Sequence, residues 1–317
     1  MRTLLQYYQM PNNLQTILLS TATADALGVP VEFSRREDLQ QNPVTDMREF
    51  GTYNQPKGTW SDDTSLMMCL AESMVEGLDL QKLAQKFIAW KNDNYWTARG
   101  WVFDIGIGTR IAIERLENGT PPELAGGFDE MDNGNGSLMR ILPLVLYIKD
   151  LDIDQRYEWT KKVSSLTHAH VRSVMACFYY LEFAKKILEG KDKLQAYSEL
   201  QSEMIAYFEN REINPLEIQK FNRLLTEDIS TYNEADIHSR GYVIYTLEAS
   251  IWCILTTSNY KEAVLKAVNL GEDTDTTAAV TGGLAGLIYG LENIPKDWLE
   301  VVARITDLEE LAQRFEK

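Results

Sequence analysis

The most informative stretch for the architecture of this chain is GEDTDTTAAVTGGLAGLIYG, residues 271–290. Its second half has apolar residues at helical spacing, and Gly282, Gly283 and Gly286 fall inside that pattern. Each interior glycine costs a helix roughly 1 kcal/mol relative to alanine. We therefore expect this helix to approach another helix closely, with Gly290 as its C-terminal cap.

Helical periodicity dominates the rest of the chain. Apolar residues recur every three to four positions in several segments, whereas strict alternation is hard to find. Two stretches, 167–188 and 241–255, are apolar around most of their circumference and are expected at the centre. Other apolar stripes lie at residues 138–148, at 263–270, and on Leu14, Ile17, Leu18 and Thr21. The pattern predicts an all-α fold of about a dozen helices.

Composition is typical of a globular protein, with 44% hydrophobic and 25% charged residues among 317. No Pro/Gly/Ser-rich linker and no internal repeat interrupts the chain, so we expect one compact multi-helix domain over residues 1–317. The formal charge of −16 repels phosphate backbones and anionic membranes. Nucleic acid and membranes are therefore not expected partners.

Cysteine usage and the N-terminus bear on location. Cys69, Cys177 and Cys253 are scattered and lie in apolar, helix-like sequence, which favours buried free thiols over a disulfide framework. The N-terminal residues show no signal-peptide pattern, and no segment is expected to reach the length of a membrane span. A cytoplasmic protein is expected.

Two acidic clusters precede predicted helices. In Ser61-Asp62-Asp63-Thr64, local evidence favours an ordinary helix start with Ser61 as the N-cap. The second cluster, residues 272–276 (EDTDT), has three carboxylates and two hydroxyls, more than one helix end needs. Unless the backbone curls around a cation, Glu272 or Thr274 is expected to face away from Asp273 and Asp275.

A third acid, Glu32, follows the helix stop signals Gly28 and Pro30, where a plain turn is the alternative. If the acids of the three segments converge, five carboxylates would not all stay ionised without a cation. One divalent ion would leave the group at about −3 and two at about −1, so two are favoured. Hard oxygen ligands select Mg²⁺, Mn²⁺ or Ca²⁺. The converging set would be Glu32, Asp62, Asp63, Asp273 and Asp275.

Three further segments carry weaker signals. Residues 132–140 (DNGNGSLMR) form a glycine-rich loop before a predicted helix, and such a loop exposes backbone N–H groups to an anion or is only a turn. Asp104 stands ahead of a predicted helix over residues 111–116, where a cap or a solvated charge is the simpler interpretation. His168 and His170 lack a third zinc ligand, so capping or solvent-facing histidines are favoured.

These segments together resemble a known family. GTWSDDTSLMM, GNGSLMRILPL, LTHAH, ADALGVPVEF, RGYVIYTLEASIWCIL and AVNLGEDTDTTAAVTGGLAGLIYG occur here in the order found in ADP-ribosylhydrolases related to the dinitrogenase reductase–activating glycohydrolase. The matches run from about Asp25 to Gly290. The resemblance implies an all-α fold with a binuclear Mg²⁺ or Mn²⁺ centre in a cleft. The metal ligands that it implies are Glu32, Ser61, Asp62, Asp63, Asp273, Asp275 and Thr276.

The resemblance also implies a substrate-binding set and a reaction. The loop residues Gly134, Asn135, Gly136 and Ser137 match the segment that contacts ADP-ribose, and His168 matches a residue lining that pocket. The DIGIGTR stretch, which contains Asp104, resembles the corresponding stretch of bacterial family members that remove ADP-ribose from arginine. Family members often have Thr at position 61 and Gly at position 24. Asp25 lies in the opening motif but is not expected to be a ligand.

The implied activity is hydrolysis of the N- or O-glycosidic bond between ADP-ribose and a modified protein side chain, with arginine as the expected acceptor. Either Asp62 or Asp63 would take the proton of the attacking water, and Asp104 would recognise the leaving group. Two alternatives stay open. One is a hydrolase of small ADP-ribose esters or phosphates, and the other is a non-catalytic ADP-ribose-binding relative, against which the intact acidic clusters speak.

Overall fold

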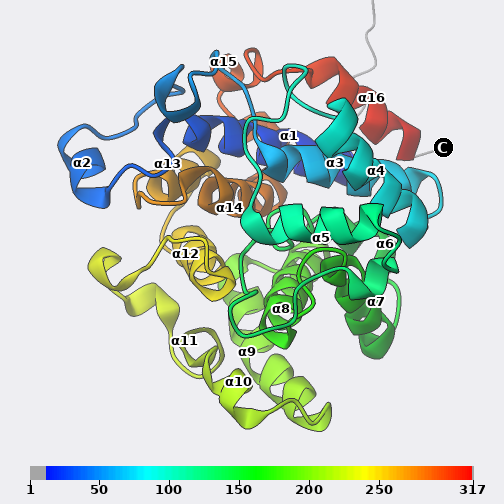
Figure 1. Ribbon diagram of the computed structural model, residues 1–317. Coiled ribbons are helices and arrows are strands. Elements are labelled where there is room, and N and C mark those ends of the chain that lie inside the picture. Colours follow the sequence, from blue (N-terminus) through cyan, green and yellow to red (C-terminus); the bar gives the residue numbers. More distant parts are fainter. Residues whose placement is uncertain (1–11, 316–317) are drawn as a thin grey trace, which may run out of the picture.

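The computed structural model describes residues 12–315. Within this range the chain forms sixteen α-helices and six 3₁₀-helices, and its only β-pairing is three isolated bridges (Figure 1). The prediction of an all-α fold is confirmed, and the number of helices exceeds a dozen because many are short. The first eleven residues, where no signal peptide is expected, lie outside the described residues.

The longer α-helices are α1 (Asn13–Gly28), α3 (Asp62–Val75), α4 (Leu80–Asp93), α5 (Ile107–Glu117), α7 (Ile153–Ser165), α8 (Val171–Leu188), α9 (Lys193–Asn210), α12 (Val243–Leu255), α13 (Tyr260–Val268), α14 (Thr274–Tyr289) and α16 (Ile305–Phe315). The shorter ones are α2 (Arg36–Gln41), α6 (Leu144–Ile148), α10 (Pro215–Gln219), α11 (Asn222–Leu225) and α15 (Lys296–Leu299). The 3₁₀-helices are η1 (Val29–Val31), η2 (Gly51–Tyr53), η3 (Pro122–Leu124), η4 (Ile229–Thr231), η5 (Glu234–Asp236) and η6 (Leu291–Asn293).

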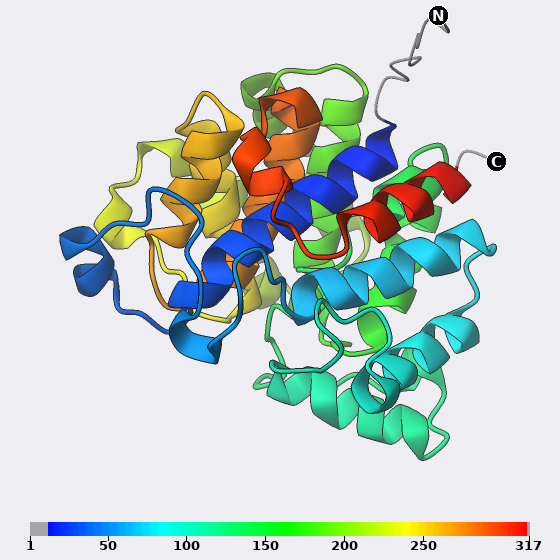
Figure 2. The same ribbon diagram turned by 90° about the horizontal axis from the view of Figure 1, so that it is seen from above.

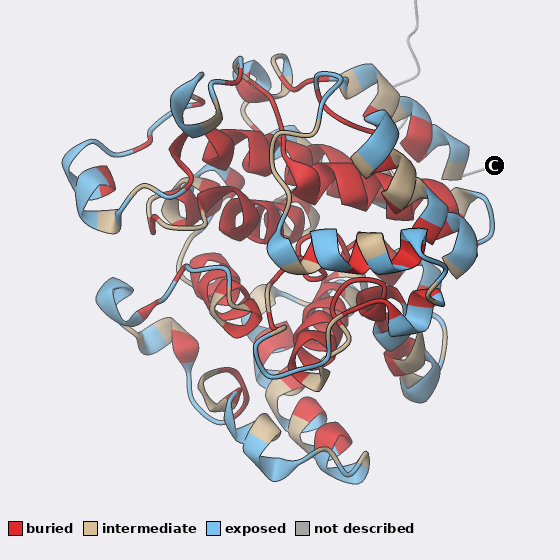
Figure 3. Ribbon diagram, in the orientation of Figure 1, coloured by how far each residue is buried: buried red, intermediate tan, exposed pale blue. Residues whose placement is uncertain are grey.

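The centre of the molecule is the pair α1 and α14, which lie along each other with α12, α13 and α16 around them (Figures 1 and 2). Almost every residue of α1 is buried, and Figure 3 shows the same for α14 and most of α12. The stretches 167–188 and 241–255, expected at the centre, contain α8 and α12, which are buried along most of their length and both pack against α14. The residues of α1 expected to form an apolar stripe, Leu14, Ile17, Leu18 and Thr21, are all buried, and neighbours also cover the other sides of this helix.

The first helix also bears on the expectation about membrane spans. Within residues 12–315, Asn13–Val31 is long and apolar enough to cross a membrane, so the expectation that no segment reaches that length is wrong. In this structure 94% of its most apolar window is buried inside the protein. Its apolar composition is that of a core helix.

The glycines of α14 explain how the two central helices come so close. A Cβ at Gly282 would lie 2.3 Å from the Cβ of Ala24, and a Cβ at Gly286 would lie 2.3 Å from Ser20 Oγ. Both partners belong to α1. The expected close helix approach is confirmed, and Gly290 caps α14 with a φ of 88°.

One helix is shorter than expected. The stripe over residues 138–148 predicted a single helix, but only Leu144–Ile148 is helical, and residues 136–143 form turns and irregular backbone. Pro143 has no N–H group and disfavours helical backbone at Leu142, which accounts for the interruption. The glycine-rich loop therefore does not lead directly into a helix N-terminus.

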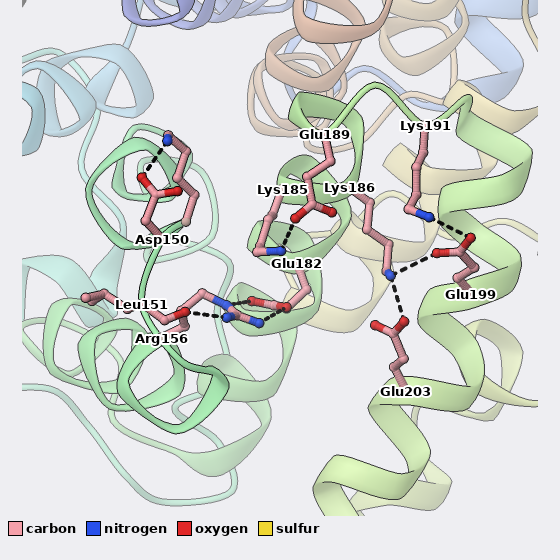
Figure 4. Close-up of polar contacts among 11 residues, drawn as sticks. Asp150, Leu151, Arg156, Glu182, Lys185, Lys186, Glu189, Lys191, Glu199 and Glu203 are labelled. Atoms are coloured by element: carbon pink, nitrogen blue, oxygen red, sulfur yellow. Dashed lines mark hydrogen bonds and ion pairs between the residues drawn. The ribbon is translucent and has the colours of Figure 1, made fainter.

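Ion pairs tie α7, α8 and α9 together (Figure 4). Arg156 of α7 pairs with both carboxylate oxygens of Glu182 on α8, at 2.6 and 2.7 Å. Lys186 of α8 lies between Glu199 and Glu203 of α9, at 3.2 and 2.8 Å. These charges are satisfied within the helix packing.

Candidate metal centre and cavity

A cavity of about 610 Å³ opens beside the N-termini of α3, α5 and α14. This volume is in the range of small-molecule sites. Its wall contains many of the residues that the sequence singled out. They are Glu32, Asp62, Asp104, Gly134, Asn135, Gly136, His168, Asp273 and Thr276.

The first acidic cluster begins α3 as predicted. Ser61 is the N-cap, and its hydroxyl accepts a hydrogen bond from the backbone N–H of Asp63. The same hydroxyl lies 2.8 Å from Asp63 Oδ2, to which it donates. Asp62 reaches the cavity wall, whereas Ser61 and Asp63 lie behind it. The helix-cap interpretation and the ligand interpretation therefore describe the same residues.

The second acidic cluster begins α14. Asp273 is the N-cap residue and is half-buried, and Asp275 lies in the first turn and is buried. Glu272 has a φ of 61° and turns outward toward Arg240, at 3.8 Å. The hydroxyl of Thr274 donates to the carbonyl of Gly28 at 2.8 Å. The sequence predicted that one or the other of Glu272 and Thr274 faces away, and in the structure the carboxylate of Glu272 and the hydroxyl of Thr274 both have partners outside the acidic pair.

Backbone contacts bring Glu32 to this cluster. The N–H of Phe33 donates to the carbonyl of Glu272 at 2.6 Å, and the N–H of Glu272 donates to the carbonyl of Ser34 at 2.8 Å. Gly28 permits the approach, since a Cβ there would lie 2.4 Å from the Cα of Asp275. The loop after α1 and the loop before α14 are thereby joined.

The carboxylates of the three segments converge. Oxygens of Asp25, Asp63 and Asp275 lie within 4.8 Å of one another, and so do oxygens of Glu32, Asp104 and Asp275. Asp275 is common to both groups. Carboxylate oxygens clustered in this way could hold a metal ion.

The clustered acids have raised pKa values and, among the described residues, no cationic side chain to pair with. Burial raises the pKa of Glu32 to about 8, and the charge of Asp104 adds to the shift. Burial and the neighbouring acids raise the pKa of Asp62, Asp63 and Asp275 well above the ordinary range. Burial also raises the pKa of Asp104 and Asp273. Within residues 12–315, no lysine, arginine or histidine forms an ion pair with any of these six acids.

Three carboxylate oxygens provide a direct test of whether a cation fits. Glu32 Oε2, Asp63 Oδ1 and Asp275 Oδ2 are buried and have no hydrogen-bond partner among the described residues. A buried carboxylate oxygen without a partner is costly. Hard divalent cations bind such oxygens, so the residues present fit a metal centre.

Asp25 has a different function from its neighbours. Both of its oxygens accept the backbone N–H of Ser61, at 3.0 and 3.1 Å, and Oδ2 also accepts the backbone N–H and the hydroxyl of Thr64, at 3.1 and 2.6 Å. Burial raises its pKa to about 6, and these hydrogen bonds oppose the shift. Through these hydrogen bonds Asp25 anchors the start of α3.

The glycine-rich loop forms the opposite wall. The side-chain amide of Asn135 donates to Asp273 Oδ2 at 2.7 Å and to Thr246 Oγ1 at 2.8 Å, so it orients the acid as well as lining the cavity. Ser137 does not reach the cavity. Its hydroxyl is buried, accepts from Ser164 at 2.9 Å and lies 3.4 Å from Cys177 Sγ. Any contribution of Ser137 to ligand binding would therefore come from its backbone and not from its side chain.

The two histidines of the LTHAH segment separate. His170 caps α8, where its Nδ1 accepts the backbone N–H of Arg172 at 3.2 Å. His168 lines the cavity, and its Nδ1 lies 2.9 Å from Thr167 Oγ1. The capping function expected for these histidines is thus found only at His170.

Sequence reasoning missed several residues of the site. Tyr53 interacts with the carboxylates of Glu32 and Asp104, which lowers the pKa of each against the effect of burial. Thr109 and Arg115 of α5 also line the cavity. Tyr53 and Arg115 stand in no distinctive local pattern, so only the tertiary structure identifies them. Thr109 lies in the DIGIGTR stretch, where we expected a function for Asp104 alone.

Comparison with known proteins agrees with this geometry. The family model for ADP-ribosylglycohydrolase matches residues 10–317. ADP-ribosylarginine hydrolase Tri1 of Serratia proteamaculans (strain 568) is 32% identical over 310 residues, covering 94% of this chain and 77% of the relative. ADP-ribosyl-[dinitrogen reductase] glycohydrolase of Rhodospirillum rubrum is 27% identical, covering 89% and 87%.

Among solved structures, an ADP-ribosylglycohydrolase-related protein complex has a TM-score of 0.78 at 28% identity and covers 96% of both chains. The match therefore extends over the fold as well as the motifs. The family resemblance noted from the sequence is confirmed. This chain belongs to the ADP-ribosylglycohydrolase family.

Proposed function

We propose that this protein is a metal-dependent ADP-ribosylhydrolase that releases ADP-ribose from arginine side chains of modified proteins. The observation that carries the proposal is the set of buried, unpartnered carboxylate oxygens of Glu32, Asp63 and Asp275 beside a cavity of small-molecule size. The relative from Serratia proteamaculans, named an ADP-ribosylarginine hydrolase, supports arginine as the acceptor.

The proposed metal centre uses oxygen ligands only. Two Mg²⁺ or Mn²⁺ ions fit the number of carboxylates better than one, because seven acids counting Asp25 and Asp104 lie close together. When bound, such ions lower the pKa of a coordinated water and orient substrate oxygens. The proposed ligands are Glu32, Ser61, Asp62, Asp63, Asp273, Asp275 and Thr276.

The two aspartates of the first cluster differ in access. Asp62 lines the cavity, whereas Asp63 lies behind it and its Oδ2 is engaged by the hydroxyls of Ser61 and Thr276, at 2.8 and 3.3 Å. A general base must be within reach of the proton that it takes. Asp62 is therefore the proposed base that takes the proton of the attacking water.

The remaining walls would bind the two ends of the substrate. Gly134 and Gly136 have no side chain, so the loop backbone can be approached closely by the ADP-ribose group. At the other end, the half-buried Asp104, which lines the cavity, would pair with the guanidinium of a modified arginine. Holding both ends would orient the bond to be cleaved.

The proposal extends to domain organisation, compartment and partners: we propose a single domain over residues 1–317 that acts on ADP-ribosylated proteins in the cytoplasm, with no nucleic-acid or membrane partner. The free cysteines Cys69, Cys177 and Cys253, all buried, agree with a reducing compartment.

Hydrolysis of defined peptides tests the function. The protein is incubated with arginine-linked and with serine-linked mono-ADP-ribosylated peptides, with Mg²⁺, with Mn²⁺ or with EDTA, and free ADP-ribose is measured. We expect release from the arginine-linked peptide that EDTA abolishes. Release from the serine-linked peptide alone would overturn the acceptor. Hydrolysis of only small ADP-ribose esters, or binding without hydrolysis, would support one of the alternatives.

A further inference from the structure

Arg140 is a buried charge without a carboxylate partner. Its side chain is fully buried, and its guanidinium lies 4.8 Å from the centre of the Phe87 ring. Nη2 donates to the carbonyl of Val163 at 3.1 Å and to Thr167 Oγ1 at 2.9 Å. Nε and Nη1 have no partner among the described residues. Burying a charge with so few partners is costly, so a purely space-filling function would be better served by an apolar side chain.

The hydrogen bond to Thr167 continues to His168. Thr167 Oγ1 lies 2.9 Å from His168 Nδ1. The guanidinium of Arg140 has N–H donors and no acceptor, so Arg140 is the donor in its hydrogen bond to Thr167. This bond occupies one lone pair of Thr167 Oγ1. Within the described residues, the only acceptor left for the hydroxyl hydrogen is His168 Nδ1. Nδ1 is then an acceptor, and the proton of the neutral ring is on Nε2.

The Nε2 atom faces the cavity. A Cβ at Gly108 would lie 3.1 Å from Nε2, and a Cβ at Gly134 would lie 3.3 Å from it. A Cβ at Gly136 would lie 2.7 Å from Cε1. Glycines at these positions therefore leave room around the ring, and no described residue forms a hydrogen bond with Nε2. An N–H donor at this place is available to a ligand.

We propose that Arg140 and Thr167 are positioning residues that hold His168 in the tautomer with the proton on Nε2. The ring then presents a neutral hydrogen-bond donor to an oxygen of the ADP-ribose group. This inference rests on the proposed function for the identity of the ligand, whereas the tautomer itself is a property of the free protein. No proton is transferred, because the ring only donates a hydrogen bond.

The ionisation of His168 agrees with this arrangement. Burial and the positive charge of Arg140 lower its pKa to about 3. The ring therefore stays neutral at physiological pH, where a tautomer is meaningful. A neutral donor also avoids adding a buried cation beside Arg140.

Nitrogen NMR of the full-length protein tests the tautomer directly. The chain has only three histidines, so ¹⁵N-labelled histidine gives few signals, and His168→Gln identifies those of His168. Protonated and unprotonated ring nitrogens have different ¹⁵N shifts. We expect unprotonated Nδ1 and protonated Nε2 in the wild type and in Thr167→Ser. Thr167→Val removes the donor hydroxyl, so we expect Nδ1 to become protonated in part or fully.

Kinetics and binding then test the donor function. We expect Thr167→Val to raise KM by about 10-fold or more, the effect of losing a hydrogen bond of about 1.4 kcal/mol, with kcat changed by less than about 2-fold. Thr167→Ser restores the wild-type value. The matched control is Thr160→Val on α7, which is equally buried and bonds only to the carbonyl of Arg156. It should change neither KM nor the ring signals.

The outcomes separate this inference from the proposed function. A protonated Nδ1 in the wild type, or an unchanged tautomer and KM in Thr167→Val, would overturn the inference even in an active hydrolase. If no peptide is hydrolysed, the dissociation constant of free ADP-ribose replaces KM. An equal constant for wild type and Thr167→Val would then overturn the donor function.

Discussion

At the scale of single residues, the sequence predicted the acids of the site but not the residues that hold these acids in place. Asp273 and Asp275 stand in a cluster whose carboxylate density exceeds the needs of a helix start, and this is visible in the sequence. Asp25 and Tyr53 carry no such local signal, because their function depends on contacts with residues tens of positions away. Local patterns alone described Glu32 as part of a turn, charge counting placed it among the acids that could converge, and family resemblance supported it as their partner.

Asp273→Asn should separate activity from folding. The amide keeps an oxygen that accepts the hydrogen bond from Asn135, now 2.7 Å long, so the fold should be preserved. Loss of a proposed ligand should lower kcat/KM by more than about 100-fold, since even outer partners of metal ligands contribute 10–100-fold. Activity is measured on the arginine-linked peptide, and stability by urea unfolding with EDTA.

The matched control is Glu272→Gln, the neighbouring acid that faces outward toward Arg240. It should leave kcat/KM within about 2-fold, because its carboxylate has no contact with the site. Full activity in Asp273→Asn would remove this residue from the metal centre. A urea midpoint in EDTA that falls well below the wild-type value would instead show that the carboxylate supports the fold.

At the scale of elements, the sequence predicted where helices occur more reliably than which helices pack against each other. The glycines of α14 indicated a close neighbour, but nothing in the sequence identified α1 as that neighbour. The interruption before α6 was missed because the apolar period continues through Pro143 while the backbone does not. Periodicity reports which face is apolar, whereas packing decides which helix covers it.

Gly282→Ala should destabilise the protein by about 1–3 kcal/mol, the usual cost of overpacking a core. The added methyl would lie 2.3 Å from the Cβ of Ala24 on α1. The double variant Gly282→Ala/Ala24→Gly removes that contact and should recover part of the loss. Urea unfolding of the four proteins gives the coupling energy. Additive losses would show that these two side chains do not set the distance between the helices.

At the scale of the whole molecule, the fold gathers negative charge that the chain does not neutralise. The formal charge of −16 excluded nucleic acid as an expected partner, but it did not show where the acids meet. That depends on three loops far apart in the chain, since Glu32 precedes Asp62 by 30 positions and Asp273 by 241. Tertiary contacts of this length lie beyond periodicity and local motifs.

The metal-free protein should lose stability as pH rises from about 5 to 8. Burial raises the pKa of Glu32 to about 8 and that of Asp25 to about 6, so the folded state holds protons that the unfolded state has released. The stability from these protons is present at low pH and is lost as pH passes the folded pKa, at roughly 1.4 kcal/mol per unit for each such group. Thermal unfolding in EDTA measures the loss.

Added Mg²⁺ or Mn²⁺ should reverse this trend. Metal binding requires deprotonated carboxylates, so the rise in Tm on adding metal should be small at pH 5 and large at pH 8. A calcium series run in parallel shows whether the centre selects among hard cations. An equal rise at both pH values would mean that the cation binds away from the buried acids.

The pairing of α1 with α14 also has a consequence for synthesis of the chain. The almost fully buried helix α1 is made first, and its main partner α14 follows about 250 residues later. At about 5–20 residues per second, α1 waits ~12–50 s on the ribosome before α14 exists. During that interval its apolar surface is available to chaperones or to other nascent chains. A shortened chain that ends before α14 would leave that surface without its native cover.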